Sequence, residues 1–254
     1  MLEGFLAALV IATVTAPVGV SGAVFLLPVQ LDLLKVPNPS VTPTNLMFNV
    51  VAGPGALLKY RRAGQLTGPL TRQLLLGTLP GVVVGAVIRV YLVPGPKVFR
   101  LVAACVLLPI GVWLVQRSLS HTPRRHTPFS AQRITALALV VGVVGGIYGI
   151  GGGSILGPVL VGSGMTVSLV APAALASTFV TSIAGALTYL LLALGQSGSI
   201  APDWSVGVAC GLGGLMGGYV GAQLQPRMPE TALRLLLGGL AIALAIVYAV
   251  EAVA

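Results

Sequence analysis

The sequence predicts an all-α polytopic membrane protein whose two halves repeat each other. Of its 254 residues, 56% are hydrophobic and only 7% are charged, and the mean hydropathy is +1.00. A soluble globular chain carries about 25% charged residues, so these few charges cannot coat a soluble domain. At about 20 residues per span, the length leaves room only for short loops, and the composition also excludes intrinsic disorder.

The net charge of +9 does not indicate a nucleic-acid partner, because the basic residues lie in loops between apolar stretches, where the positive-inside rule places them. The two cysteines, Cys105 and Cys210, each lie inside an apolar run without a neighbouring His or Cys. We therefore expect small buried side chains there, and neither a disulfide framework nor a metal site.

Eight apolar stretches follow one another along the chain. They cover residues 4–35, 41–59, 72–93, 98–116, 134–165, 167–194, 204–224 and 231–253. The widest and most basic interruption is 117–133. It divides the chain into a first transmembrane repeat (1–116), a basic cytoplasmic linker (117–133) and a second transmembrane repeat (134–254).

The first stretch of each half differs from the other three. Residues 4–35 and 134–165 are each 32 residues long, which is about 48 Å as one helix against a hydrocarbon core of about 30 Å. The first stretch is interrupted by proline and glycine at 16–22, and the second by glycines at 145–153. Each stretch is too long for one upright span and too short for two, so we expect a re-entrant helical hairpin followed by three full spans.

Matching residues recur in the same order in the two halves, which indicates duplication. The pairs at an offset of 130 are Gly19 and Gly149, Gly22 and Gly152, and Pro28 and Pro158; those at 129 include Pro43 and Pro172, and Leu46 and Leu175; those at 136 include Gly81 and Gly217, and Gly85 and Gly221.

The distribution of charges distinguishes two topologies. If each first stretch were a single span, the chain would have eight spans in two parallel four-helix repeats, with 8 basic residues on one side and 6 on the other. If each first stretch is a hairpin, the second half is inverted and the division becomes 10 against 4. The positive-inside rule favours the inverted arrangement, with both termini outside.

Repeated halves with interrupted segments are typical of secondary transporters. A glycine cluster that opens a half-helix presents unpaired N–H groups and the positive end of a helix dipole, which together suit an anion. The predicted anion-binding residues at the two breaks are Ser21, Gly22, Gly151, Gly152, Gly153 and Ser154. The alternative is that these glycines serve close helix packing.

Neutral polar side chains follow each break at membrane depth: Asn45, Asn49, Thr178 and Ser182 are the candidates. Such groups either bind a solute or join helices by hydrogen bonds; Asn49 and Thr178 match at the repeat offset. No Asp, Glu or His falls at mid-membrane. The sequence therefore predicts no carboxylate-based proton relay, no catalytic residues, no metal and no cofactor.

Several strings together resemble the TauE/SafE family of sulfite-exporter-like membrane proteins. They are the glycine motif 149–153 with Pro158, the polar helix 176–189, the segments 202–204 and 213–222, and the first-half version 44–64. The resemblance implies export of a small sulfur-containing anion, sulfite or an organosulfonate, across the bacterial cytoplasmic (inner) membrane. The first half departs from the family pattern, because its break, Gly19 to Gly22, is poorer in glycine.

Two other functional classes are also compatible with parts of the sequence. An accessory subunit of a larger transport complex is compatible with a short chain without a separate domain. A membrane lipid-pyrophosphate phosphatase can also use inverted repeats, but it should carry a glutamate-rich cluster and an arginine near the hairpin tips, and this chain has neither. The expected partners are a small anion and the lipid bilayer, and no pattern indicates an oligomeric state.

Overall fold

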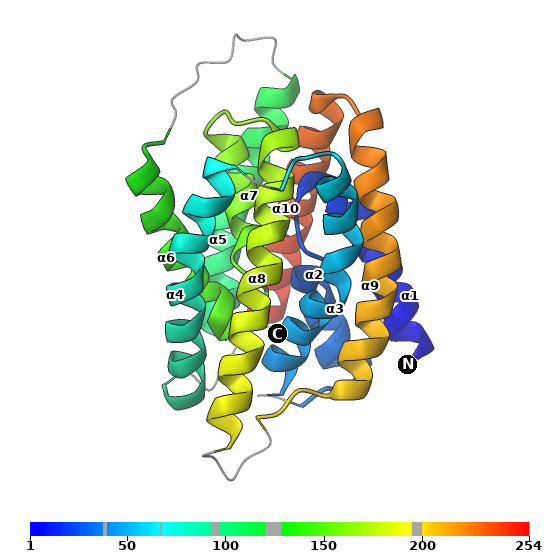
Figure 1. Cartoon of the computed structure of the whole chain (residues 1–254), viewed down its shortest axis with the longest axis vertical. Coiled ribbons are helices and arrows are strands. Elements are labelled where there is room, and N and C mark those ends of the chain that lie inside the picture. Colours follow the sequence, from blue (N-terminus) through cyan, green and yellow to red (C-terminus); the bar gives the residue numbers. More distant parts are fainter. Residues whose placement is uncertain (38–39, 67, 93–96, 120–128, 195–199, 254) are drawn as a thin grey trace.

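The computed structural model describes residues 1–37, 40–66, 68–92, 97–119, 129–194 and 200–253, and every regular element in these ranges is helical (Figure 1). The first half contains α1 (Leu2–Thr15), η1 (Ala16–Val18), α2 (Ala23–Pro28), η2 (Val29–Leu33), α3 (Val41–Arg62), α4 (Pro69–Tyr91) and α5 (Lys97–Leu119). The second contains α6 (Ala131–Tyr148), α7 (Gly153–Gly162), α8 (Val167–Ala193), α9 (Trp204–Leu224), η3 (Gln225–Arg227) and α10 (Glu230–Val253).

Within the described ranges, 5 helices are long and apolar enough to cross a membrane: α4, α6, α8, α9 with η3, and α10. The all-helical membrane class predicted from composition is therefore confirmed. The 22-residue α3 is not among these helices. Its two asparagines, Asn45 and Asn49, lower its hydropathy although both are buried.

The first apolar stretch folds back on itself, with its helices interrupted at Gly19–Gly22. Gly4, near the start of α1, lies against the Leu34 side chain just beyond η2; a Cβ added to this glycine would lie 3.0 Å from Leu34 Cδ1. The two ends of the stretch are thus adjacent. Figure 1 shows the same reversal between α6 and α7, around the break at Gly149–Gly152.

Rows of glycine let the first helix of each half approach a helix of the other half. Cβ atoms added along α4 at Gly77, Gly81 and Gly85 would lie 2.4, 2.5 and 2.1 Å from α6 carbonyl oxygens. Added along α9 at Gly213, Gly217 and Gly221, they would lie 2.1, 2.2 and 2.6 Å from α1 carbonyl oxygens. Only glycine permits such backbone contact, which is the usual packing of helices in lipid.

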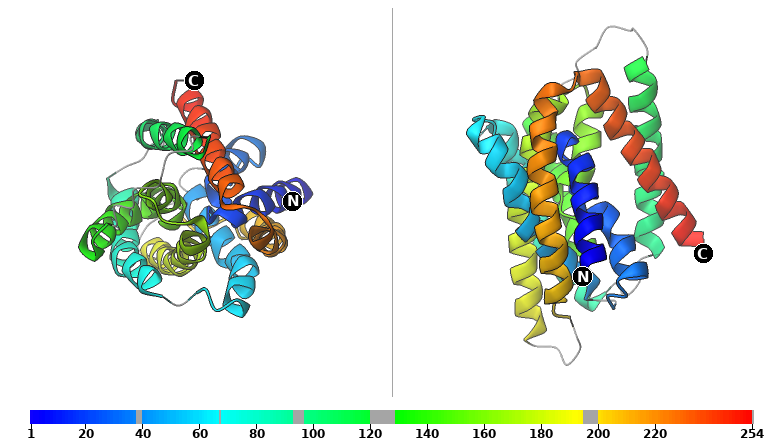
Figure 2. Two further views of the ribbon diagram at one scale, coloured as in Figure 1. Left: turned by 90° about the horizontal axis from the view of Figure 1, so that it is seen from above. Right: turned by 90° about the vertical axis from the view of Figure 1, so that its right-hand side faces the viewer.

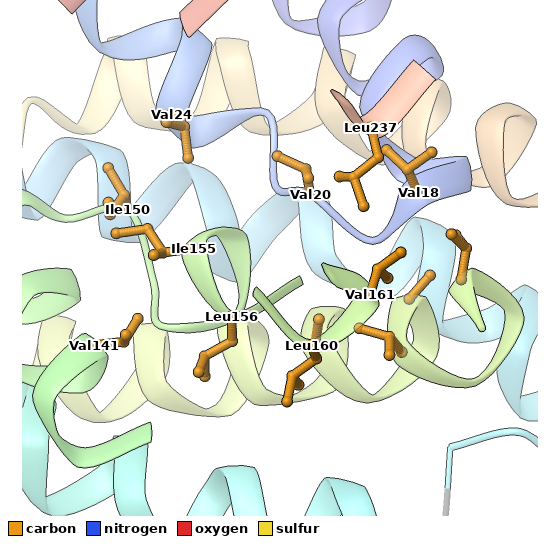
Figure 3. Close-up of a cluster of buried hydrophobic side chains, with 14 of the residues drawn as sticks. Val18, Val20, Val24, Val141, Ile150, Ile155, Leu156, Leu160, Val161 and Leu237 are labelled. Carbon is orange, nitrogen blue, oxygen red and sulfur yellow. The ribbon is translucent and has the colours of Figure 1, made fainter. Parts of the chain in front are cut away.

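The largest core cluster surrounds α7 and unites both breaks (Figure 3). Almost all of α7 is buried, which explains why it is apolar on every side. Val18, Val20 and Val24 of the first break pack in one cluster with Ile150 and Ile155 of the second. The two interruptions, far apart in the sequence, therefore lie together in the middle of the molecule.

Candidate functional site

The two breaks share one backbone conformation. Gly19 has φ +76° and Gly149 has φ +71°, the left-handed region in which glycine avoids strain. Each also packs against the N-terminal part of a long helix from the opposite half: an added Cβ would lie 2.3 Å from Ala171 Cα at Gly19 and 2.3 Å from the Thr42 oxygen at Gly149. The breaks are joined directly, because the Ser21 amide donates to Ser154 Oγ at 3.2 Å.

Polar side chains of α3 complete the first break. The Ser21 hydroxyl donates a hydrogen bond to Asn49 Oδ1 and accepts one from the Ala23 amide at 3.1 Å. One turn earlier on α3, Asn45 Nδ2 donates to the Ala23 carbonyl at 2.9 Å. These bonds fix α2 against α3 and hold Asn49 with its amide nitrogen directed away from Ser21.

The second break is closed by Thr178 of α8. The Gly153 amide donates to Thr178 Oγ1 at 3.1 Å, and the Thr178 methyl lies against Gly151, where an added Cβ would be 2.5 Å away. Ser154 Oγ donates back to the Ile150 carbonyl at 3.3 Å. The Gly153 amide and the Ser154 hydroxyl of this glycine-rich turn are thus both bonded to protein atoms.

A buried tyrosine anchors each break to the long helix of its own half. Tyr60 donates from its hydroxyl to the Ala16 carbonyl at 3.1 Å, and Tyr189 donates to the Gly146 carbonyl at 2.8 Å. The tyrosines are 129 positions apart and their acceptors 130, so both bonds follow the repeat offset. Each satisfies a carbonyl in the last turn of a helix that ends in the membrane.

A small cavity of about 40 Å³ lies beside the first break, between α1, α3, α8 and α9. A buried water needs roughly 10–15 Å³ by the same measure, so this space suits a few waters or one small ion. Its polar lining comes from Thr15, Ser21, Asn49 and Thr178, with Gly22 and the Phe179 ring beside them.

Two polar atoms at this cavity have no hydrogen-bond partner in the described part of the chain. They are Thr15 Oγ1 and Asn49 Nδ2, on side chains that are 1% and 3% exposed. A buried polar group without a partner costs about 1–3 kcal/mol. Both atoms belong to residues that line one cavity, and both can donate a hydrogen bond to an acceptor there.

The comparison with family models identifies the chain. The model described as Sulfite exporter TauE/SafE matches residues 4–248. The chain belongs to the TauE/SafE family. Neither the search of curated proteins nor the search of solved structures gave a match.

Members of the TauE/SafE family are membrane transporters, not enzymes, as the sequence predicted. The chain is a multi-pass membrane protein, since its apolar helices are long enough to cross a bilayer. In the described residues no group of three or more His, Cys, Asp or Glu side chains is placed to hold a metal ion.

The structure brings some of the predicted site residues of this TauE/SafE chain to the cavity and leaves others elsewhere. Ser21, Gly22, Asn49 and Thr178 line it. The remaining candidates, Asn45, Gly151, Gly152, Gly153, Ser154 and Ser182, are not among the lining residues; Ser182 is buried, and no partner for its hydroxyl was found within the described ranges.

Sequence reasoning missed Thr15, Tyr60 and Tyr189. The tyrosines had a usable signal, because they match at the repeat offset of 129 like the polar residues around them. Thr15 had none, because it lies at the end of an apolar helix and its repeat mate at 130 is Gly145.

Proposed function

We propose that the protein is a secondary transporter that exports a small sulfur-containing anion, sulfite or an organosulfonate, across the bacterial cytoplasmic membrane. The cavity at the first break is the binding site. The main observation behind the proposal is that two buried groups, Thr15 Oγ1 and Asn49 Nδ2, have no hydrogen-bond partner among the described residues and belong to residues that line one cavity of about 40 Å³.

Neutral donors suit an anion that must be released again. The Asn49 amide and the Thr15 hydroxyl can each donate to an oxygen of the anion, and Thr178 and Gly22 complete the lining. Because the cavity lining contains no lysine or arginine, no full opposite charge traps the substrate. The small volume favours sulfite over a longer organosulfonate.

The proposed architecture is a pair of inverted repeats, 1–116 and 134–254, joined by the linker 117–133, much of which lies outside the described residues. Three matched features support it: glycine rows 136 positions apart that contact carbonyls 130 positions apart, the two tyrosine bonds, and the two left-handed glycines. Each break would be the tip of a re-entrant hairpin near the bilayer midplane, as in other transporters with discontinuous helices.

The proposed orientation follows from the basic residues. One end of the molecule, the upper end in Figure 1 and in the right-hand view of Figure 2, gathers the end of α3, the start of α4 and the turn between α9 and α10. The basic residues of those segments are Lys59, Arg61, Arg62, Arg72, Arg227 and Arg234. The positive-inside rule makes this the cytoplasmic end. A monovalent anion leaving from this side gains about 2.3 kcal/mol per 100 mV.

The test is sulfite efflux from proteoliposomes that contain the purified protein, with and without an imposed potential. Asn49→Leu keeps the number of side-chain heavy atoms and removes the donor together with the acceptor of the Ser21 hydroxyl, and Thr15→Val removes the hydroxyl. We expect Asn49→Leu to reduce flux by about tenfold or more, the effect of losing a hydrogen bond of about 1.5 kcal/mol to a charged group. Thr15→Val should reduce it by a smaller factor.

Thr13→Val is the matched control, because the Thr13 hydroxyl donates to the Leu9 carbonyl of its own helix at 2.7 Å. It should leave flux unchanged. Equal flux in wild type, Asn49→Leu and Thr15→Val would exclude the cavity as the site. If folded wild-type protein carried no sulfite but did carry taurine or another organosulfonate, the proposed substrate would change and the proposed site would stand.

A further inference from the structure

A groove runs along the outside of α4 and α8, beginning at the end of the molecule where the basic residues gather. It consists of two adjacent cavities, of about 680 and 460 Å³, that share the lining residues Gly68 and Thr71. The two helices pack against each other along this line. Neither cavity shares a lining residue with the proposed anion site.

The larger cavity is apolar along its length. Leu75, Leu76, Leu79 and Pro80 line it from α4, and Val180 lines it from α8. Leu76 is 59% exposed. A leucine-lined groove on the outer face of membrane-crossing helices faces the hydrocarbon of the bilayer, not water.

The smaller cavity is more polar and lies at the start of both helices. Gln65, Thr71 and Ser168 line it, and Gly68 at the N-cap of α4 leaves the backbone accessible. Arg72 lines the groove just below and is exposed. Among the described residues that line the two cavities there is no carboxylate, so none of them neutralises this arginine.

We propose that the groove binds an anionic phospholipid, with an acyl chain along the leucines and the phosphate beside Arg72 and Thr71. Basic pockets between membrane helices on the positive side commonly take acidic headgroups. A free inorganic anion would use the polar end and leave the apolar length unfilled. A zwitterionic lipid would fill the apolar length of the groove, but its headgroup would be attracted less strongly to Arg72.

The experiment is a titration of purified protein in detergent with phosphatidylglycerol or phosphatidylcholine of equal chain length, with bound lipid counted by native mass spectrometry. Wild type should prefer phosphatidylglycerol. Arg72→Gln should weaken phosphatidylglycerol binding about fivefold and leave phosphatidylcholine unchanged, whereas Arg72→Lys should retain the preference. Leu76→Trp, which fills the groove from an exposed position, should weaken both lipids.

Arg227→Gln is the control, because Arg227 is also exposed at this end but bonds to the Gln223 carbonyl of its own helix at 3.2 Å. It should leave the lipid preference intact. Equal binding of the two lipids to wild type, or equal losses in Arg72→Gln and Arg227→Gln, would overturn the proposal. Displacement of phosphatidylglycerol by millimolar inorganic phosphate, with Leu76→Trp without effect, would identify a free-anion site instead.

Discussion

The two breaks share one scaffold but differ in what fills it. Both have a left-handed glycine that touches the opposite half and a tyrosine that anchors the preceding helix. At the second break, Thr178 occupies the Gly153 amide and its methyl covers Gly151. At the first, Asn49 and Thr15 face a cavity with polar atoms unused. The two breaks therefore share a backbone conformation and a tyrosine anchor, and under the proposed function only the first break leaves room for a ligand.

The largest expected effect tests the shared part of the comparison. Gly19→Ala and Gly149→Ala should destabilise the protein equally, each by more than the roughly 1–2 kcal/mol of left-handed strain, because the new Cβ would also collide with backbone 2.3 Å away. The measurement is thermal unfolding of purified protein in detergent, together with the yield of folded protein from membranes.

Gly64→Ala separates strain from collision. Gly64 has φ +70° but no atom within 4 Å of an added Cβ, so this variant should show the strain alone. If Gly149→Ala lost no more stability than Gly64→Ala, the close contact with Thr42 would not contribute. If Gly19→Ala at the same time lost more, the two breaks would not be equivalent in packing.

The next effect tests what differs between the breaks. Thr178→Val removes the acceptor of the Gly153 amide and should cost about 1–3 kcal/mol of stability, the penalty of an unsatisfied buried donor. Thr178→Ser keeps the acceptor and loses only the methyl group against Gly151, so it should stay closer to wild type. Both are measured as shifts in melting temperature beside sulfite efflux.

Comparing Thr178→Val with Asn49→Leu distinguishes a structural role from a role in binding. At Asn49 we expect a loss of transport that exceeds the loss of stability. Asn49→Leu also removes the acceptor of the Ser21 hydroxyl, so some stability is lost, but the Asn49 amide nitrogen has no partner among the described residues. In Thr178→Val we expect the loss of stability to exceed the loss of transport. The reverse pattern, a stable but inactive Thr178→Val beside an active Asn49→Leu, would transfer the binding role to the second break.

The fold was largely predictable because its determinants are local and periodic. Residues 4–35 and 134–165 are the wrong length for any simple span, and proline and glycine mark where they are interrupted, so the breaks at Gly19–Gly22 and Gly149–Gly152 follow from the sequence. Glycines four residues apart in α4 and α9 also predict close helix contacts.

The position of the cavity was harder to predict, because a glycine indicates that another group lies close to its backbone but does not indicate which group. The second break carries the richer glycine motif, 149–153, yet a protein side chain and backbone approach it, from Thr178 and Ala174. The place of Thr15 at the cavity could not be predicted for a related reason: the hydroxyl of a threonine in a helix usually donates to a carbonyl of its own helix, as that of Thr13 does. Only the three-dimensional arrangement shows that the Thr15 hydroxyl has no such partner.

The smallest expected effect concerns the tyrosines, and it tests the repeat most directly. Tyr60→Phe and Tyr189→Phe each remove one hydroxyl and one bond, to the Ala16 and Gly146 carbonyls. Interhelical hydrogen bonds in membranes contribute about 0.6 kcal/mol on average, with a maximum of about 1.7. Both variants should therefore lose a similar small amount of stability, measured as melting temperature, and both should retain sulfite efflux. Because the two bonds fix helix ends at corresponding positions of the proposed repeats, a loss confined to one tyrosine would mean that the halves share geometry but not the interactions that maintain it.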